Sequence, residues 1–327
     1  MTLHMTLHLN RRILLAASAA LCLLSSPAAL AQAYPSQPIK VVVPYPAGGA
    51  TDVLARLFSQ KLQESWAQTV VVENRPGAGG TIGAGQVAKA PADGHTVLFS
   101  IVALLQQITL MKLPYDPMKD FQPITRVAVS PSVLAVPKDT PAKDLKEFLA
   151  SVKANPGKTS FGTYGAGTSS HLQGALLNMQ AGLDMVHVPF QGGAPLVNAM
   201  LGGQLGMAFL DAGTSRPHLD KFKLYGTTGP ARLAWLPNVP TLKEQGLHSY
   251  EPMGWFGMFL PAGTPKAVVD KFSAEALRIL ALPDVRERIE AMGLIPAADT
   301  PPAFAEVMRG DAALYAKIIK DANISLN

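Results

Sequence analysis

Apolar residues along this chain follow two spacings in turn, which predicts strands alternating with helices. The run Ile39–Val43 has the length and apolar character of a buried strand. In the segment after it, apolar residues recur at helical spacing and the charged residues fall between them. The apolar face of this predicted helix holds Val53, Leu54, Leu57, Phe58 and Leu62. This combination is typical of a buried strand that leads into an amphipathic surface helix.

The same alternation continues through the rest of the chain. We expect further strands at Thr69–Val72, in the segment DGHTVLFS, and at Thr159–Thr163, Met185–Pro189 and Leu205–Leu210. We expect helices over Lys143–Ala154 and beginning at Ser170, Pro195, Pro265, Pro283 and Pro301. Strands that alternate with helices favour mostly parallel sheets, so the fold class predicted here is α/β.

Two long extended runs interrupt this order. The first is FQPITRVAVSPSVLAVP, broken at Pro131, and the second is SYEPMGWFGMFLPAG. If both runs cross between domains, the chain leaves one lobe and later returns to it. We therefore predict one lobe from residues 34–129 with 256–327 and a second from 130–255. A cleft between strand ends of two such lobes suits ligand capture.

The N-terminus reads as a secretory signal peptide over residues 1–33. Arg11 and Arg12 precede the apolar run Ile13–Leu24, and small residues follow up to Ala33. This order predicts cleavage near Ala33/Tyr34, and the apolar run is too short to span a membrane. The single cysteine, Cys22, lies inside this segment. We therefore expect a soluble mature protein, outside the cytoplasm and without a thiol.

Charge and composition exclude several classes of function. The formal net charge is +5, and Arg11 and Arg12 supply two of these charges. The remaining excess is too small and too scattered for a nucleic-acid surface. No two histidines after residue 33 have zinc-like spacing and no carboxylate cluster accompanies them, so we expect neither a metal nor a cofactor.

Glycine-bearing turns recur where predicted strands end and helices begin. The four turns lie in PYPAGGATD, GTYGAGTSSH, PFQGGAP and LDAGTSRP. Glycine lets backbone N–H groups approach a ligand, and a helix start adds unpaired N–H donors. None of the turns has a lysine or arginine before its helix. Together they predict an anion site built from N–H groups, hydroxyls and water, although each turn alone could be an ordinary strand–helix connection.

Several longer stretches carry a resemblance to a known family. They are YPSQPIKVVVPYPAGGATDVLARL, VVVENRPGAGGTIGAGQVAKAPADGHTVLF, LPYDPMKDFQPIT, HVPFQGGAP and GTPKAVVDKF. Together they resemble the Bug family, the extracytoplasmic solute receptors of tripartite tricarboxylate transporters. The resemblance implies a two-lobed, type II-like periplasmic-binding-protein fold that closes around a small carboxylate. It also implies a monomeric periplasmic receptor that delivers its ligand to a membrane permease.

The resemblance implies a set of ligand-binding residues in the turns. In the first turn, one carboxylate would be held by Tyr45, Ala47, Gly48, Gly49, Thr51 and Asp52. The matching positions of the second lobe are Thr163, Gly165, Thr168, Ser169, Phe190, Gln191, Gly192 and Gly193. Asp211 matches an acidic position that can meet an ammonium in amino-acid-binding relatives, and its alternative role is to cap the helix after AGTS.

The chain departs from the family pattern at two places. Phe190 and Gln191 stand where the family commonly has tyrosine and lysine, so a charge is absent beside the cleft. After the third strand, the run from Ser100 and Ile101 to Leu105 is apolar where relatives often have small polar residues. This run would suit an aromatic or longer aliphatic acid as a wall of the site, or it could be core of the following helix.

A binding receptor without chemistry is the leading hypothesis, so we expect no enzyme activity. The alternative is a secreted serine hydrolase using Ser169 or Ser170 with His171 and Asp211. That alternative lacks the G-x-S-x-G turn on which such nucleophiles are usually presented. We expect His171 to pack or cap where its helix begins, and His187 to be a buried, hydrogen-bonded strand residue.

Overall fold

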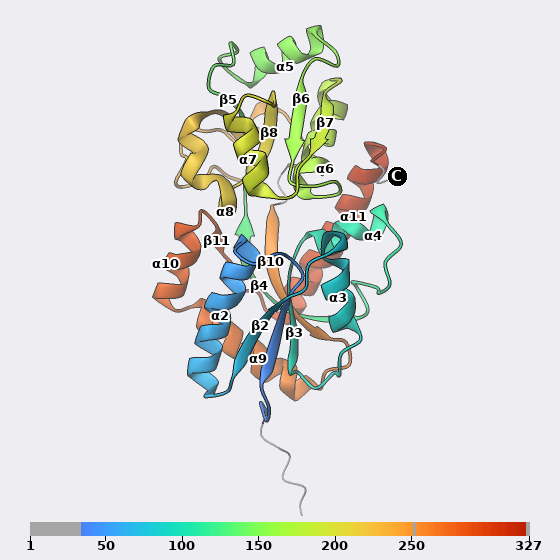
Figure 1. Ribbon diagram of the computed structural model, residues 1–327, viewed down its shortest axis with the longest axis vertical. Helices are drawn as coiled ribbons and strands as arrows, with labels where there is room; N and C mark the ends of the chain where they lie inside the picture. The colour runs from blue at the N-terminus through green and yellow to red at the C-terminus, as the bar shows by residue number, and fades with distance from the viewer. Residues whose placement is uncertain (1–33, 251–252, 325–327) are drawn as a thin grey trace, which may run out of the picture. The chain divides into compact units, whose positions relative to one another are not determined.

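The computed structural model describes residues 34–250 and 253–324 (Figure 1). The predicted signal peptide, residues 1–33, lies outside the described residues. From Gln37 onward the chain forms one unit with two sheets. None of the described helices combines the length and apolar character that a membrane crossing requires.

The first sheet gathers six strands of the described chain in the order β11, β4, β10, β3, β1, β2. Three of them are parallel: β1 (Ile39–Val43), β2 (Val70–Asn74) and β3 (Thr96–Ile101). Strand β10 (Gly254–Pro261) runs antiparallel between β3 and β4 (Phe121–Ser130), and the short β11 (Ile295–Pro296) pairs with β4. The carboxyl ends of β1 and β3 therefore meet at one edge, where helices begin.

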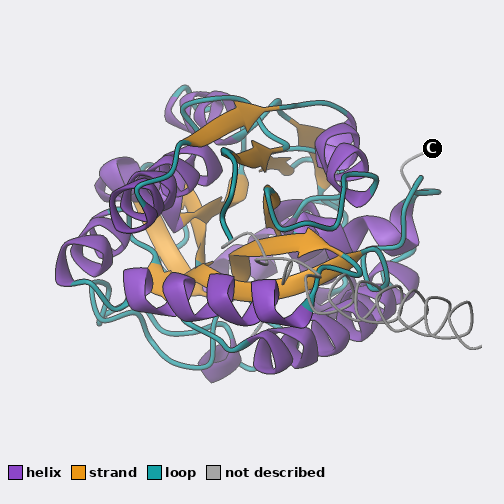
Figure 2. Cartoon of the chain, turned by 90° about the horizontal axis from the view of Figure 1, so that it is seen from below, coloured by secondary structure: helices purple, strands orange, loops and turns teal. Residues whose placement is uncertain are grey.

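Helices cover the strands of this sheet (Figure 2). α2 packs on β1, β2 and β3, α3 packs on β1 and β3, and α9 and α11 pack on β4. The bounds are α2 (Ala50–Trp66), η1 (Ala78–Gly80), α3 (Thr81–Ala88), α4 (Ala103–Leu110), α9 (Lys266–Leu280), α10 (Pro283–Ala291) and α11 (Pro301–Asp321). The predicted helix starts near Pro265, Pro283 and Pro301 are confirmed. Pro283 and Pro301 are the first residues of their helices, where the N–H that proline lacks would have no partner in the helix, and Pro265 is the N-cap residue of α9.

The second sheet has the order β7, β6, β8, β5, β9 within the described residues. β6 (Ser160–Thr163) is parallel to β7 (Val186–Pro189) and β8 (Met207–Asp211), while β5 (Ser132–Pro137) is antiparallel to β8 and β9 (Phe222–Thr227). Its helices are α5 (Leu145–Ala154), α6 (Ser169–Ala181), α7 (Gly193–Leu201), α8 (Ala212–Ser215), η2 (Arg216–Lys221) and η3 (Lys243–Gln245).

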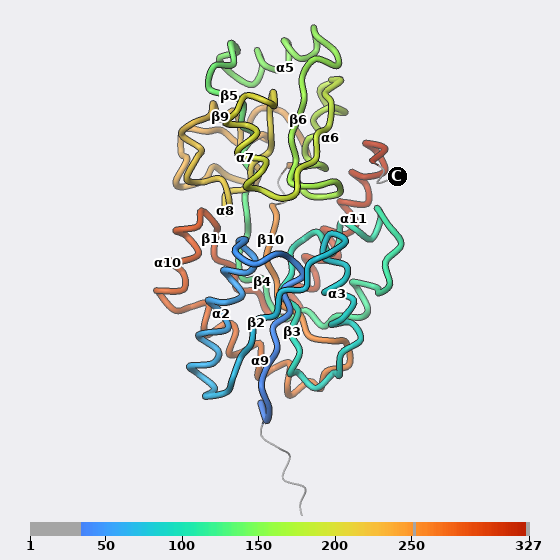
Figure 3. The backbone as a smooth tube through the Cα atoms, viewed as in Figure 1, coloured from blue at the N-terminus to red at the C-terminus, as the bar shows by residue number. Residues whose placement is uncertain are grey.

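The two-lobed α/β fold is confirmed, and both sheets are mixed. The predicted strand–helix alternation gives the parallel pairs, whereas the crossing strands β4, β5 and β10 pair antiparallel. The chain passes from the first sheet to the second at Pro131, between β4 and β5 (Figure 3). Ser130 and Gly254 are paired in the first sheet. The precise lobe limits at residues 129/130 and 255/256 stay a prediction.

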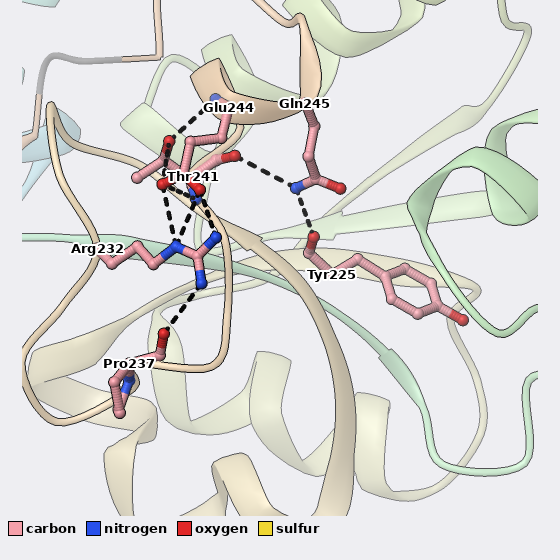
Figure 4. A network of polar contacts seen from close by, with 6 residues as sticks. All are labelled: Tyr225, Arg232, Pro237, Thr241, Glu244 and Gln245. Carbon is pink, nitrogen blue, oxygen red and sulfur yellow. Dashed lines mark hydrogen bonds and ion pairs between the residues drawn. The ribbon is translucent and has the colours of Figure 1, made fainter.

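A polar network organises the segment that follows β9 (Figure 4). The Arg232 guanidinium donates to the Glu244 carboxylate and to the Pro237 carbonyl. Gln245 Nε2 donates to the Tyr225 carbonyl of β9 at 2.8 Å, and Glu244 N donates to Thr241 Oγ1. These contacts attach the segment to the second sheet before the chain returns to β10.

An aromatic cluster joins β10 to α11 in the first lobe. Phe304 is fully buried, and its ring centroid lies 5.2 Å from those of Trp255 and Phe259. Trp255 Nε1 also donates to Asp311 of α11 at 2.8 Å. This packing fixes the strand along which the chain returns from the second lobe.

We expect Phe304→Ala to lower the free energy of unfolding by about 3–5 kcal/mol, because it leaves a cavity beside the rings of Trp255 and Phe259. Ile82→Ala is the control, since Ile82 is 60% exposed and its truncation should cost below about 0.5 kcal/mol. Urea unfolding of both variants measures this difference. Equal losses in the two variants would show that α11 does not anchor β10.

Candidate functional site

The four glycine-bearing turns lie next to one another in the structure. A Cβ atom at Gly165 would lie 3.8 Å from the Phe190 carbonyl oxygen, and one at Gly193 would lie 2.7 Å from Thr214 Cγ2. A Cβ at Gly213 would lie 3.5 Å from Cβ of Ala50, the first residue of α2. The turn of the first lobe and the three turns of the second lobe therefore lie in one contiguous cluster.

Asp52 holds the first turn in shape. Its carboxylate is buried and accepts hydrogen bonds from Gly48 N at 3.0 Å, Arg56 Nε at 3.0 Å and Asn74 Nδ2 at 2.9 Å. Burial raises the pKa of Asp52, but the hydrogen bonds from Arg56, Gly48 and Asn74 outweigh it and hold the pKa below its ordinary value. Because three hydrogen bonds from the protein occupy this carboxylate, Asp52 positions the turn.

The helix start that follows leaves backbone donors available. The first hydrogen bond of α2 runs from Val53 N to the Gly49 carbonyl at 3.0 Å. The N–H groups of Ala50 and Thr51 precede it and have no carbonyl one turn earlier in the helix. Ala47, Gly48 and Gly49 are exposed, whereas Thr51 is buried. The predicted residues of this turn therefore divide into exposed backbone and buried support.

Tyr45 and Ser100 join the first turn to the end of β3. Their side chains are hydrogen-bonded, and burial raises the pKa of the Tyr45 hydroxyl. A Cβ at Gly80 would lie 2.9 Å from this hydroxyl, so the glycine, which also has a φ of +102°, makes room for the ring. The tyrosine hydroxyl therefore stays protonated and anchored to Ser100.

The apolar run after Ser100 belongs mainly to the core. Val102, Leu104 and Leu105 are buried within the main hydrophobic cluster. For these residues the burial favours the core interpretation, and a ligand-facing wall that includes them stays a prediction. Ile101, at the end of β3, keeps partial exposure. The reason is that α4 begins directly after β3 and turns its apolar face inward.

The turn before α6 is fixed by side chains behind it. Thr163 Oγ1 and His187 Nε2 lie 2.8 Å apart, and Gly167 N donates to His171 Nδ1 at 3.1 Å. Thr168 Oγ1 donates to the Gly165 carbonyl at 2.6 Å. The turn can hold this form because Gly165 and Gly167 have φ angles of +139° and +74°.

Ser169, the first residue of α6, connects the two lobes. Gln106 Nε2 of α4 donates to Ser169 Oγ at 2.9 Å, and Gln106 is fully buried. The first backbone bond at this helix start runs from Leu172 N to the Thr168 carbonyl. The backbone N–H groups of Ser169 and Ser170 precede that bond, as in α2.

The turn at Phe190–Gly193 adds an open edge. Phe190 is half-buried and packs against the core of the second lobe, while Gln191 is exposed. Gly192 has a φ of +111°, and a Cβ placed there would meet no protein atom within 4 Å. The backbone at Gly192 therefore faces space that another molecule can enter.

Asp211 caps a helix start, which is the alternative role considered for it. Its Oδ1 accepts from Thr214 N at 3.0 Å at the beginning of α8. Burial raises the pKa of Asp211, and its negative charge contributes to raising the pKa of Tyr164. Capping uses one oxygen of the carboxylate and leaves the other without this role.

The residues of the hydrolase alternative are engaged elsewhere. His171 Nδ1 accepts from Gly167 N, Ser170 Oγ accepts from Tyr164 N at 3.2 Å, and Ser169 Oγ accepts from Gln106. Burial and the neighbouring His187 lower the pKa of His171 to about 4. Among the described residues, no three metal-ligating side chains form a cluster that could hold an ion.

Comparison with known proteins identifies the family. Residues 54–324 match the family described as tripartite tricarboxylate transporter family receptor. The chain belongs to this family. A Pseudomonas sp. (strain P51) relative, the UPF0065 protein in the tcbD-tcbE intergenic region, is 38% identical over 97% of this chain and 96% of its own. The resemblance to the Bug family is thereby confirmed, together with a structural match to the periplasmic binding protein BugD.

The solved structures agree with this assignment. BugD is 34% identical with a TM-score of 0.79, over 89% of this chain and 99% of BugD. MatC from Rhodopseudomonas palustris with bound malate is 32% identical with a TM-score of 0.78, covering 88% and 100%. An R. palustris protein with adipate is 28% identical with a TM-score of 0.82, covering 89% and 99%. The family and these neighbours are solute-binding proteins, so the receptor is a binding protein and not an enzyme.

Sequence reasoning missed several residues that support the site. Arg56, Asn74 and Gln106 were not predicted, although Arg56 lies one helical turn after Asp52 and Asn74 ends β2. The i, i+4 spacing of Asp52 and Arg56 was a usable signal. Asn74 and Gln106 gave no signal, because their partners are distant in the sequence.

We expect Asp52→Asn to lower the receptor's free energy of unfolding by about 2–3 kcal/mol, because an amide cannot accept from all three donors. Asp270→Asn is the control. Asp270 pairs with Lys266, which lies four residues before it, and the Asp270 side chain is 58% exposed. Loss of this exposed ion pair should cost below about 1 kcal/mol. Denaturant unfolding at pH 7 compares the two.

The stability difference between wild type and Asp52→Asn depends on pH. Since the folded pKa of Asp52 is depressed, its contribution is complete above the ordinary value of 3.8 and is lost as pH falls through the folded value. The difference between wild type and Asp52→Asn should therefore shrink in acid. A difference that is constant down to pH 2 would contradict the assigned charge.

Proposed function

We propose that this receptor captures a small organic carboxylate between its lobes and delivers it to a tripartite tricarboxylate transporter-type permease. The observation that carries the proposal is the meeting of helix-start turns from both lobes, with exposed backbone at Gly48 and Gly49 and partly exposed backbone at Gly192. The helix starts offer N–H donors and a partial positive charge, which suit a carboxylate. Binding to malate and adipate in the solved neighbours supports this ligand class.

The proposed contacts come from the turns of both lobes. In the first lobe, the backbone of Ala47, Gly48 and Gly49 and the first-turn N–H groups of α2 meet one carboxylate. In the second lobe, the α6 start at Thr168 and Ser169 and the open edge at Gln191 to Gly193 meet the rest of the ligand. Tyr45, Asp52, Ser100 and Thr163 hold these turns, and Ile101 and Phe190 supply apolar surface.

The ligand's charge is met without a basic side chain in the turns. Arg56, on α2, donates to Asp52 and so serves the loop. We infer an aliphatic or aromatic mono- or dicarboxylate as the ligand, with a hydrogen-bond donor favoured near Asp211. The receptor acts as a monomer in the periplasm after removal of residues 1–33. Contacts divided between lobes would favour the closed state when the acid binds.

We expect calorimetric titration to detect binding of at least one acid from a panel containing malate, adipate and benzoate. Gly49→Val should weaken that binding by more than about tenfold, or 1.4 kcal/mol, because its side chain enters the space before α2. Gly49 has a φ of −76°, so the variant needs no disallowed backbone angle, unlike a change at Gly48 with its φ of +84°.

Gly310→Val provides the matched control for this experiment. Gly310 lies in α11, is exposed, and a Cβ there meets no atom within 4 Å. It should bind like wild type. Equal affinity of Gly49→Val and wild type would place the ligand elsewhere, and a wild-type protein that binds no carboxylate would refute the proposed function.

We expect Asp211→Asn to shift the ligand ranking toward fully ionised diacids and to weaken acids that donate a hydrogen bond at that position. The physical reason is that two like charges about 4 Å apart in a partly dehydrated cleft cost on the order of several kcal/mol. Asparagine is also a good N-cap, so α8 should keep its cap. Calorimetry against mono- and dicarboxylates tests this, and an unchanged ranking would leave Asp211 with the capping role alone.

A further inference from the structure

Two histidines behind the turn of α6 form a stacked pair. The rings of His171 on α6 and His187 on β7 have centroids 3.9 Å apart and planes 7° apart. Phe161 of β6 stacks on His187 with a centroid distance of 5.1 Å. His171 is buried and His187 half-buried, so the pair forms part of the packed interior of the second lobe.

Each histidine contacts a different end of the turn between β6 and α6. His171 Nδ1 accepts from Gly167 N near the helix start, and His187 Nε2 lies 2.8 Å from Thr163 Oγ1 at the strand end. The first contact requires a free electron pair on Nδ1, so His171 carries its proton on Nε2. An imidazolium has N–H groups at both positions and accepts no hydrogen bond.

We propose that His171 and His187 are positioning residues, which hold the second-lobe turn in its carboxylate-binding form only while the His171 ring is neutral. This inference rests on the proposed function. The pair directs Gly167 N–H inward, and the backbone of the turn then keeps the glycine conformation that places the α6 start beside Phe190 and Gly193. Protonation of His171 breaks the hydrogen bond from Gly167 N–H, so the α6 start is no longer held beside Phe190 and Gly193.

The groups around the pair act against a positive charge on His171. Burial and the neighbouring His187 together lower the pKa of His171 to about 4, while burial lowers the pKa of His187. The titratable groups on the elements packed against α6 are engaged elsewhere: Asp211 of β8 caps α8, and Tyr315 of α11 is hydrogen-bonded to Gln106. Asp311 of α11 accepts from Trp255, and Lys317 pairs with Asp321.

The direction of the pH effect follows from this depressed pKa. Between pH 6.5 and about 4, an unfolded or released His171 binds a proton that the held ring does not. The turn conformation held by neutral His171 is therefore fully favoured above pH 6.5, and its stability relative to the released turn decreases as pH falls toward 4. Carboxylate affinity should fall over the same range, in addition to any change in the ligand's own ionisation.

His171→Asn is the decisive variant, because its Oδ1 can accept from Gly167 N and does not titrate. With malate and adipate as probes, calorimetry should give His171→Asn an affinity within about threefold of wild type at pH 7.5. The ratio of variant to wild-type affinity, in which the ligand's ionisation cancels, should rise at least about twofold by pH 4, where half of His171 is protonated.

His171→Leu lacks the acceptor and should bind at least about tenfold more weakly at pH 7.5. His248→Asn, at an exposed histidine, should keep the wild-type profile.

A second readout separates this inference from the proposed function. The amide NMR signal of Gly167 should titrate with His171 in the ligand-free wild type, and this titration should vanish in His171→Asn. A wild type that binds neither acid would count against the proposed function, while the Gly167 signal would still decide whether the pair holds the turn. A Gly167 amide insensitive to pH, or an affinity ratio constant from pH 7.5 to 4, would overturn the inference.

Discussion

The passage of the chain through Pro131 is the constraint on which the site depends. Proline has no N–H to pair, so the ladder of the first sheet ends and β5 can join the second sheet one residue later. The Pro131 carbonyl accepts from Ala212 N at 3.0 Å, and Ser132 N donates to Thr228 Oγ1 at 2.8 Å. The crossing thus also fixes the start of α8, where Asp211 lies.

The proposed anion site contains one buried carboxylate, Asp52, and one partly buried carboxylate, Asp211, and their partners explain why both fit there. Asp52 accepts from a backbone N–H, a guanidinium and an amide, and Asp211 accepts from Thr214 N. Both carboxylates stabilise turns from the inside, which leaves the outward N–H groups of the helix starts for a ligand. The fold therefore uses acidic side chains to build a surface whose exposed groups are donors.

The hydrogen-bond acceptor that holds the second-lobe turn is a neutral side chain, whereas the acceptor that holds the first-lobe turn is a charged carboxylate. Gly48 N–H meets an aspartate whose pKa is lowered, and Gly167 N–H meets a histidine whose pKa is lowered. A lowered pKa has opposite effects on the charges of the two side chains: it favours the charged form of Asp52 and the neutral form of His171. Both turns thus hold an acceptor near neutral pH, and the proposed failure in acid begins at His171.

The sequence by itself determined the local elements and the turns. The strand Ile39–Val43, the proline-marked helix starts and the glycine turns follow from spacing and backbone preference, which depend on neighbouring residues. Only the tertiary structure decided that β10 lies antiparallel between β3 and β4, that Val102 to Leu105 are core, and that Asn74 and Gln106 support the turns. These outcomes depend on strand register and on side chains up to 63 residues apart, as in the bond from Gln106 to Ser169. A local pattern carries no information about which distant group completes a hydrogen bond, because that partner is chosen by how the sheets pack.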